Sequence, residues 1–283
     1  MLSRQAAGNK RNGLPVRARP RLSHAYTFRP GAGPRQIPAE AVADSTRSPQ
    51  KTLITASFLT EAAALERHTP ERFAIAGEPV VTVEFHYISN IDWLAGRGYT
   101  MVQLWWPVTF NGARDRVTGR FLAAMWENLA DPIITGRGEV GQRKLFAETP
   151  DIRITDGIYH CVASWMGFEF LDVRVSEEVA ASAPDQSGLE GTLMLKYVPR
   201  TGAWGEPEVF QVTFIPGATS DLTVEWRKPA NGTIAFRRAR WEDLPTMHHV
   251  VNALTDLPML ASRSASIART RGGKSYQDAR ILE

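Results

Sequence analysis

Alternation of apolar and polar residues along short segments is the feature that most limits how this chain can fold. The clearest case is residues 78–88, EPVVTVEFHYI. The apolar set is Val81, Val83, Phe85 and Tyr87, and the polar set is Thr82, Glu84 and His86. A period of two places the two sets on opposite faces of a strand, so this segment is predicted to be a half-buried β-strand.

Similar segments continue along the chain. Residues 99–112, YTMVQLWWPVTFNG, predict a second strand that ends at the turn-forming pair Asn111-Gly112. Segments separated by Gly, Pro, Asn and Asp are further strand candidates: RFLAAMWEN, GIYHCVASWMGFEFLDVRV, GTLMLKYVP, EVFQVTF, LTVEWRK and GTIAFRR. The region 129–152 around Lys144 is also interpreted as packed strand.

Two short helices are predicted among these strands. TEAAALERHTPERF, residues 60–73, has Thr60 as its N-cap, and Pro70 ends it. DLPTMHHVVNAL, residues 243–254, has Asp243 as its cap and Pro245 just inside.

Many strands with few helices predict an α+β, mainly β fold, either a barrel or a sandwich. The 283 residues are 43% hydrophobic and 22% charged, which is sufficient apolar material for one large core. A barrel of this size encloses a cavity, and a small ligand would bind there.

Charge separates a basic tail from the rest of the chain. Residues 1–50 contain nine Lys or Arg against Glu40 and Asp44, a net charge of +7, so the remainder carries −4 of the total +3. We interpret residues 1–50 as a flexible Pro/Gly/Arg-rich extension, with an organelle transit peptide or a nucleic-acid arm as alternatives. Residues 51–265 are predicted to form the single domain, and residues 266–283 a polar C-terminal segment.

Composition and spacing argue against several other classes of protein. No apolar run reaches the 18 residues of a membrane span, and the lone Cys161 leaves the cytoplasm as the default location. His248-His249 lack the spacing of a chelating pair on a helix, and His160-Cys161 have no second pair of ligands. We therefore interpret Cys161 as a core residue and expect neither a metal, a cofactor, a membrane nor a nucleic acid as partner. GRGEVG lacks the Lys-Ser/Thr of a phosphate loop, and the eight tryptophans have no RNA-binding motif beside them.

Four segments, in order, resemble the acetoacetate decarboxylase family. They are PVTFNG, ADPIITGRGEVGQRK, TLMLKYVP and EDLPTMHHVVNA, within residues 51–260. The family has a Schiff-base lysine seven residues after a Gly-Arg pair, and here Arg137 plus seven is Lys144. The resemblance implies a cone-shaped antiparallel β-barrel, a homo-oligomer, and an imine between Lys144 and a small keto acid or ketone.

Such a lysine must lose its proton before it can react. With a pKa of about 10.4, roughly one amine in 2,500 is neutral at pH 7. Burial or a neighbouring cation lowers the pKa, as the acetoacetate decarboxylases themselves exemplify. Arg143 and Leu145 replace a proline and a second lysine of the family, so desolvation is expected to be the main cause. Gln142 and Phe146 would share the face of Lys144 in an extended segment.

Other family positions transfer with changes. The resemblance places two acidic positions of the family at Met101 and His86, so both carboxylates are replaced. Tyr99 or Gln103, on the face of Met101, could supply hydrogen bonds instead. The family's substrate-binding arginine falls on Lys51, which could still hold a carboxylate.

We therefore expect a carbon–carbon lyase that forms a lysine imine with a small keto acid. The reaction is either decarboxylation of a 3-oxo acid or pyruvate-type aldol condensation and dehydration. The loss at Met101 favours the second reaction and predicts slow or absent release of carbon dioxide from acetoacetate. A ligand-binding barrel in which Lys144 pairs with an anionic ligand and a structural subunit with a vestigial cavity are the alternatives, and without the resemblance Lys144 would be interpreted as a surface residue at a strand edge.

Overall fold

The computed structural model describes residue 37, residues 49–177, 188–217 and 222–273, residue 276 and residues 278–283. The predicted basic tail therefore lies almost entirely outside the described residues.

Strands dominate the part of the chain that the structure describes. They are β1 (Gln50–Leu59), β2 (Phe73–Ile75), β3 (Val80–Ser89), β4 (Tyr99–Asn111), β5 (Arg116–Glu127), β6 (Lys144–Phe146), β7 (Arg153–Thr155), β8 (Ile158–Trp165), β9 (Phe168–Ser176), β10 (Gly191–Arg200), β11 (Ala203–Pro216), β12 (Thr223–Phe236), β13 (Ala261–Arg271) and β14 (Arg280–Leu282). The helices are α1 (Ala62–Glu66), the 3-10 turn η2 (Asp92–Leu94), α2 (Ala130–Val140) and α3 (His248–Thr255). None of the described helices is long and apolar enough to cross a membrane.

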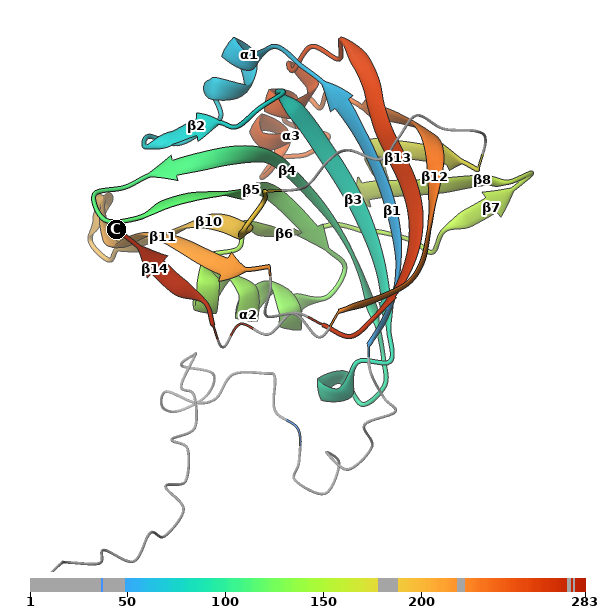
Figure 1. Cartoon of the computed structure of the whole chain (residues 1–283), viewed down its shortest axis with the longest axis horizontal. Coiled ribbons are helices and arrows are strands. Elements are labelled where there is room, and N and C mark those ends of the chain that lie inside the picture. Colours follow the sequence, from blue (N-terminus) through green and yellow to red (C-terminus); the bar gives the residue numbers. More distant parts are fainter. Residues whose placement is uncertain (1–36, 38–48, 178–187, 218–221, 274–275, 277) are drawn as a thin grey trace, which may run out of the picture.

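The described strands form one sheet, in the order β14-β11-β10-β5-β4-β3-β1-β13-β12-β9-β8-β7. In addition, β2 pairs with β4, and β6 pairs with β5. Most neighbours are antiparallel, whereas β5 pairs in parallel with β10 and β6. The long strands curve strongly, and β14 and β7, the end strands of the sheet, lie at opposite sides of the view in Figure 1. The predicted mainly β fold is confirmed.

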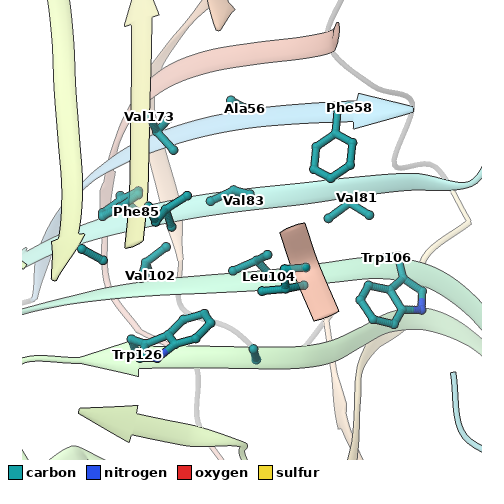
Figure 2. Packing of buried hydrophobic residues seen from close by; sticks show 14 of the residues in the cluster. Ala56, Phe58, Val81, Val83, Phe85, Val102, Leu104, Trp106, Trp126 and Val173 are labelled. Atoms are coloured by element: carbon teal, nitrogen blue, oxygen red, sulfur yellow. The ribbon is translucent and has the colours of Figure 1, made fainter. Parts of the chain in front are cut away.

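Both faces of the central strands are buried. On β3, Val81, Val83 and Phe85 are fully buried and pack in the core with Val173 of β9, as Figure 2 shows. The opposite face of β3 lines a cavity, so Glu84 is also buried, at 6% exposure. The prediction of a half-buried strand is therefore wrong, because curvature turns the polar face toward an interior cavity and not toward bulk water.

The neighbouring tryptophans of β4 show the same division. Trp105 lines the cavity, whereas Trp106 lies in the core and donates a hydrogen bond from Nε1 to Thr69 Oγ1 at 3.0 Å. Adjacent residues of a strand point to opposite faces, so one dipeptide serves both surfaces.

The predicted helix caps are wrong. Helix α1 begins after Glu61, and the backbone N–H of Thr60 instead donates to Pro79 O. Helix α3 begins after Met247, because the Asp243 carboxylate accepts hydrogen bonds from Arg240 in the turn before the helix.

Several strand boundaries also differ from prediction. LTVEWRK and GTIAFRR form one strand, β12, because Gly232 allows it to pass against β1 and β13, where a Cβ would lie 2.8 Å from that of Ala265. GIYHCVASWMGFEFLDVRV divides into β8 and β9 at Met166 and Gly167, both of which have positive φ. β13 crosses the predicted domain boundary at residue 265.

The buried aromatic layer is expected to carry much of the stability. Phe85→Ala removes a fully buried ring and should lower the free energy of unfolding by about 3–5 kcal/mol, measured by urea denaturation. Ile154→Ala, at a position 59% exposed on β7, is the control and should change it by about 0.5 kcal/mol or less. Similar losses in both variants would contradict the assigned packing.

Candidate active site

Strand register brings side chains from five strands into one row. Residues paired directly across neighbouring strands form the row Thr55, Glu84, Gln103, Met125 and Lys144. Directly paired residues point to the same face of a sheet, and all five of these line one cavity. A second row, two residues further along, contains Leu53, His86, Met101 and Glu127.

The cavity has a volume of about 290 Å³. All seven side chains predicted for the site line it: Lys51, His86, Tyr99, Met101, Gln103, Gln142 and Lys144. Phe146, which was expected to form an apolar wall, is 46% exposed and does not line it. Phe146 shares strand β6 with Lys144 but is its last residue, where the side chain is exposed to solvent. The chain before Lys144 is helix α2 and a turn, and not the extended strand that was predicted.

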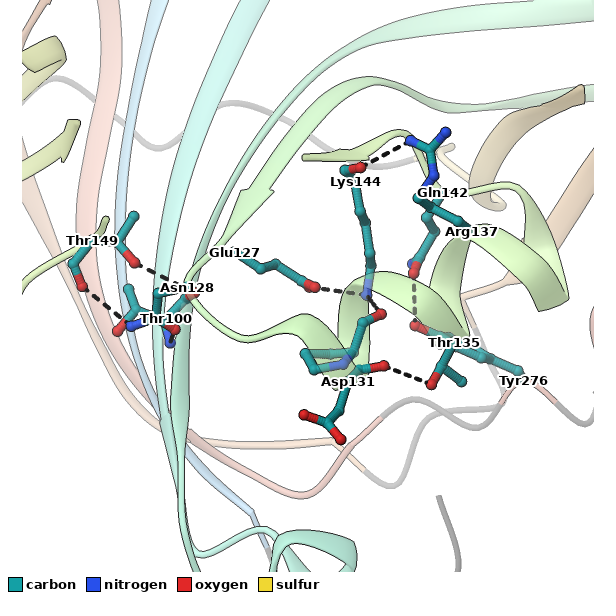
Figure 3. A network of polar contacts seen from close by, with 11 residues as sticks. Thr100, Glu127, Asn128, Asp131, Thr135, Arg137, Gln142, Lys144, Thr149 and Tyr276 are labelled. Atoms are coloured by element: carbon teal, nitrogen blue, oxygen red, sulfur yellow. Dashed lines mark hydrogen bonds and ion pairs between the residues drawn. The ribbon is translucent and has the colours of Figure 1, made fainter. Parts of the chain in front are cut away.

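Lys144 is 2% exposed and is not the surface lysine that it would have been interpreted as without the family resemblance. Its Nζ lies 2.9 Å from Oε1 of Glu127, which has no exposed surface, and donates a second hydrogen bond to Pro132 O at 2.9 Å. Figure 3 shows Glu127 and helix α2 meeting the amine from opposite directions. The amine is therefore buried beside a carboxylate that the sequence interpretation missed.

Helix α2 fits closely around the lysine. A Cβ on Gly136 would lie 2.5 Å from Lys144 Cε, 2.7 Å from its Nζ and 2.3 Å from Gln142 Oε1. Gly141 ends the helix with a φ of 76°, which suits glycine. From α2, Arg137 donates a hydrogen bond to Lys144 O at 2.9 Å.

The residues flanking Lys144 have different surroundings. The Arg143 guanidinium lies 5.0 Å from the centre of the Phe121 ring, and burial lowers its pKa. Gln142 Oε1 accepts a hydrogen bond from the Tyr276 hydroxyl at 3.2 Å (Figure 3). Gln142 and Tyr276 both line the cavity next to Lys144, where they can bind a polar group of a ligand.

The cavity also contains a carboxylate to which the sequence interpretation gave no role. Glu84 Oε2 accepts a hydrogen bond from Gln103 Nε2 at 2.5 Å and lies 3.3 Å from His86 Nε2. Burial alone would raise the pKa of Glu84, but the contacts with His86 and Gln103 and the charge of Arg120 together hold it below its usual value. The signal was present in the sequence, because Glu84 belongs to the polar set of the 78–88 strand.

Two methionines separate the charged groups of the cavity. In the first row Met125 lies between Gln103 and Lys144, and in the second Met101 lies between His86 and Glu127. These apolar side chains separate the Glu84 cluster from Lys144 on the cavity wall, whereas Glu127, which has no exposed surface, contacts Lys144 without lining the cavity.

Cations are available for an anionic ligand. Lys51, Arg120 and Arg227 line the cavity, and the Arg120 guanidinium lies 4.7 Å from the centre of the Trp105 ring. Lys51 is four residues from Thr55 along β1, hence about 13 Å away along the strand.

The other candidates from the sequence lie elsewhere. Cys161 is buried, and burial raises its pKa to about 12, which suits the predicted core role. His160 Nε2 lies 2.6 Å from Asp172 Oδ2 on β9. Among the described residues, no group of three or more His, Cys, Asp or Glu side chains could hold a metal ion.

The chain belongs to the acetoacetate decarboxylase family, because the family model described as acetoacetate decarboxylase matches residues 29–271. No curated protein matches the sequence.

Solved structures with a similar fold include acetoacetate decarboxylase from Legionella pneumophila, at 17% identity and a TM-score of 0.65 over 83% of this chain and 87% of that one. Another is the enduracididine biosynthesis enzyme MppR complexed with pyruvate, at 14% identity and 0.63 over 83% and 90%. MppR complexed with the condensation product of pyruvate and imidazole 4-carboxaldehyde matches at 13% and 0.64 over 95% and 99%. At such identities the similarity establishes a shared fold.

The tight contact at Gly136 predicts a variant that separates folding from reactivity. In Gly136→Ala the new methyl group displaces the flexible ends of Lys144 and Gln142, while alanine favours the helix by about 1 kcal/mol. The midpoint temperature of thermal unfolding should be unchanged or higher. The rate at which an amine-reactive reagent acylates Lys144 should change at least about threefold. Gly205→Ala, where a Cβ meets nothing within 4 Å, should leave Lys144 labelling unchanged. Unchanged labelling in Gly136→Ala would contradict the contact.

The lowered pKa of Glu84 predicts a pH-dependent contribution to stability. Because the folded state lowers the pKa of Glu84 below its usual value of 4.5, the contribution is complete above that pH and decreases as the pH falls below it. Glu84→Gln should lower the free energy of unfolding by about 1–2 kcal/mol at pH 7 and by less at pH 3. Urea denaturation at both pH values measures this, with the exposed Glu66→Gln as control. A larger loss at pH 3 would refute it.

Proposed function

We propose that the protein is a lyase that forms an imine between Lys144 and the keto carbon of a small keto acid. The observation that carries this proposal is a lysine 2% exposed to solvent on the wall of a 290 Å³ cavity. Lysine is almost never buried to this extent without a specific partner or purpose.

The cavity wall supplies groups that suit a keto acid. Lys51, Arg120 and Arg227 can attract its carboxylate, although Arg120 also interacts with Glu84. Gln142 and Tyr276, next to the amine, can hydrogen-bond to the carbonyl oxygen or to the hydroxyl that it becomes. Met101 and Met125 give the substrate's carbon chain an apolar surface.

A protonated imine can accept the electron pair of a bond that breaks beside it. In a 3-oxo acid this releases carbon dioxide and leaves an enamine, which is protonated and hydrolysed. In pyruvate, loss of a methyl proton gives an enamine that attacks an aldehyde, and the adduct then loses water.

Both reactions remain in the proposal. The similar Legionella protein is an acetoacetate decarboxylase, whereas MppR was solved with pyruvate and with a pyruvate condensation product. The decarboxylation branch gains support from Glu84, because the argument from Met101 assumed that the cavity contains no carboxylate.

One contact favours an enzyme over a ligand-binding barrel. Lys144 already has a counter-ion in Glu127, so an anionic ligand is not required to compensate its buried charge. A barrel that used Lys144 as an anion receptor would be expected to leave that charge to the ligand.

Trapping with borohydride tests the proposal. Protein incubated with pyruvate or acetoacetate and then reduced should gain the mass of the reduced adduct on the peptide that contains Lys144, in about one site per chain. Lys144→Arg keeps the charge but cannot form the imine under these conditions, and it should show no gain. Lys196→Arg, at a lysine outside the cavity lining, is the matched control and should react like the wild type.

The outcomes separate the candidate functions. A ketone-dependent adduct at Lys144 supports the enzyme, and carbon dioxide release from acetoacetate then identifies the decarboxylase branch. A dehydrated aldol product from pyruvate and an aldehyde identifies the other branch. No adduct across a panel of small keto acids would favour the ligand-binding alternative.

A further inference from the structure

We propose that Glu127 transfers the protons needed to form the imine at Lys144. The inference rests on the proposed function and assigns a role to a carboxylate that the family resemblance did not single out. Its basis is the contact of 2.9 Å between Glu127 Oε1 and Lys144 Nζ, in a place where Glu127 has no exposed surface.

The sheet fixes this contact. Lys144 pairs with Met125 in the parallel ladder between β6 and β5, and Glu127 lies two residues beyond Met125, on the same face. The N–H of Ala147 donates to Glu127 O at 3.1 Å, which continues the attachment past the carboxylate. The two reactive side chains therefore project from adjacent, hydrogen-bonded strands, and little freedom remains between them.

Stability alone does not account for the pair. A buried ion pair loses the hydration of both ions, and well-packed apolar residues of similar size are often at least as stabilising. Leucine or methionine would suit the surroundings, which include the apolar Met101 and Met125. A reaction that needs a proton acceptor next to an amine would explain why both residues are present.

Imine formation needs a group that both accepts and returns protons. The resting pair is an ammonium and a carboxylate, and Nζ can attack a carbonyl carbon only after it has given one proton to Glu127. The new C–N bond forms as the carbonyl π electrons move to oxygen. Glu127 gives its proton to that oxygen, which becomes a hydroxyl, and takes a second proton from Nζ.

The final step uses the second proton that Glu127 has taken from Nζ. Protonated Glu127 gives it to the hydroxyl, the C–O bond breaks, water leaves, and the nitrogen lone pair forms the C=N bond. Lys–NH3+ and a ketone have become an iminium and one water, and Glu127 is again a carboxylate. Nζ carries a positive charge before the reaction, as an ammonium, and after it, as an iminium, so Glu127 is its counter-ion at both ends of the reaction.

Glu127 is the acidic side chain nearest the amine among the described contacts. From α2 the amine meets the carbonyl of Pro132, and Arg137 binds the backbone of Lys144. Tyr276 reaches this part of the cavity through Gln142. Glu84 lies three strands away from Lys144, beyond Met125 and Gln103.

The test is the pH dependence of borohydride trapping with pyruvate, compared between the full-length wild type and Glu127→Gln. Without the carboxylate the maximal trapping rate at high pH should fall about a hundredfold, the size of a general acid–base contribution. The pH of half-maximal trapping should also fall by about one unit or more, because no negative charge stabilises the ammonium. A structural role would lower the rate without moving that pH, and a role as counter-ion alone would move that pH without lowering the maximal rate.

A matched control and a rescue complete the design. Glu148→Gln makes the same chemical change at an exposed position four residues after Lys144 and should leave both rate and midpoint unchanged. In Glu127→Ala, added formate should raise the trapping rate at least about tenfold, because it supplies a small carboxylate to the space that the glutamate side chain occupied. Circular dichroism establishes that each variant is folded.

Each result has one meaning. If the wild type traps pyruvate while Glu127→Gln traps it at the same rate with the same midpoint, the role of Glu127 is refuted and the imine enzyme stands. If the wild type itself forms no adduct, the proposed function fails. If Glu127→Gln does not fold, the Glu127→Ala rescue decides, and folded Glu127→Ala that formate does not accelerate refutes the transfer of protons.

Discussion

The contact between Lys144 and Glu127 places two opposite charges where neither side chain is more than 2% exposed. Either charge alone would be buried without hydration or a partner, so each offsets part of the desolvation cost of the other. This requirement fixes the register of β6 on β5, because a shift of one residue would turn Lys144 to the opposite face of the sheet. Helix α2 connects β5 to β6 and passes close to the Lys144 side chain. Gly136 of α2 has no Cβ and so leaves space for the lysine.

The cavity contains a second group of charged side chains, in which a carboxylate has several polar partners. Glu84 is held by Gln103 and His86, with Arg120 nearby, so its carboxylate is stabilised by neutral and positive partners. Met101 and Met125 separate this cluster from the amine. A keto acid in the cavity would therefore meet a reactive nitrogen on one part of the wall and a fixed carboxylate, with cations, on another.

The sequence predicted the features that depend on local pattern. Period-two alternation in residues 78–88 and 99–112 correctly indicated β3 and β4, and the spacing from Arg137 pointed to the one buried lysine among the described residues. Glu84 was missed because alternation distinguishes two faces of a strand but does not show that curvature makes both interior. Glu127 was missed because it becomes a partner of Lys144 through the pairing of β5 with β6, which sequence spacing does not indicate. Helix α2 contains two glycines, which disfavour a helix, so its formation depends on packing around Lys144.

The double burial of β3 and β4 also bears on how such a scaffold can diversify. Where these strands pass the cavity, alternate residues belong to the hydrophobic core and the residues between them line the cavity, so the two sets can change with little mutual interference. A lineage could alter the reaction or the substrate by replacing inward residues such as Met101 while the packed layer continued to specify the fold. For protein engineering, the same separation defines a small set of positions at which randomisation would alter catalysis more than folding stability.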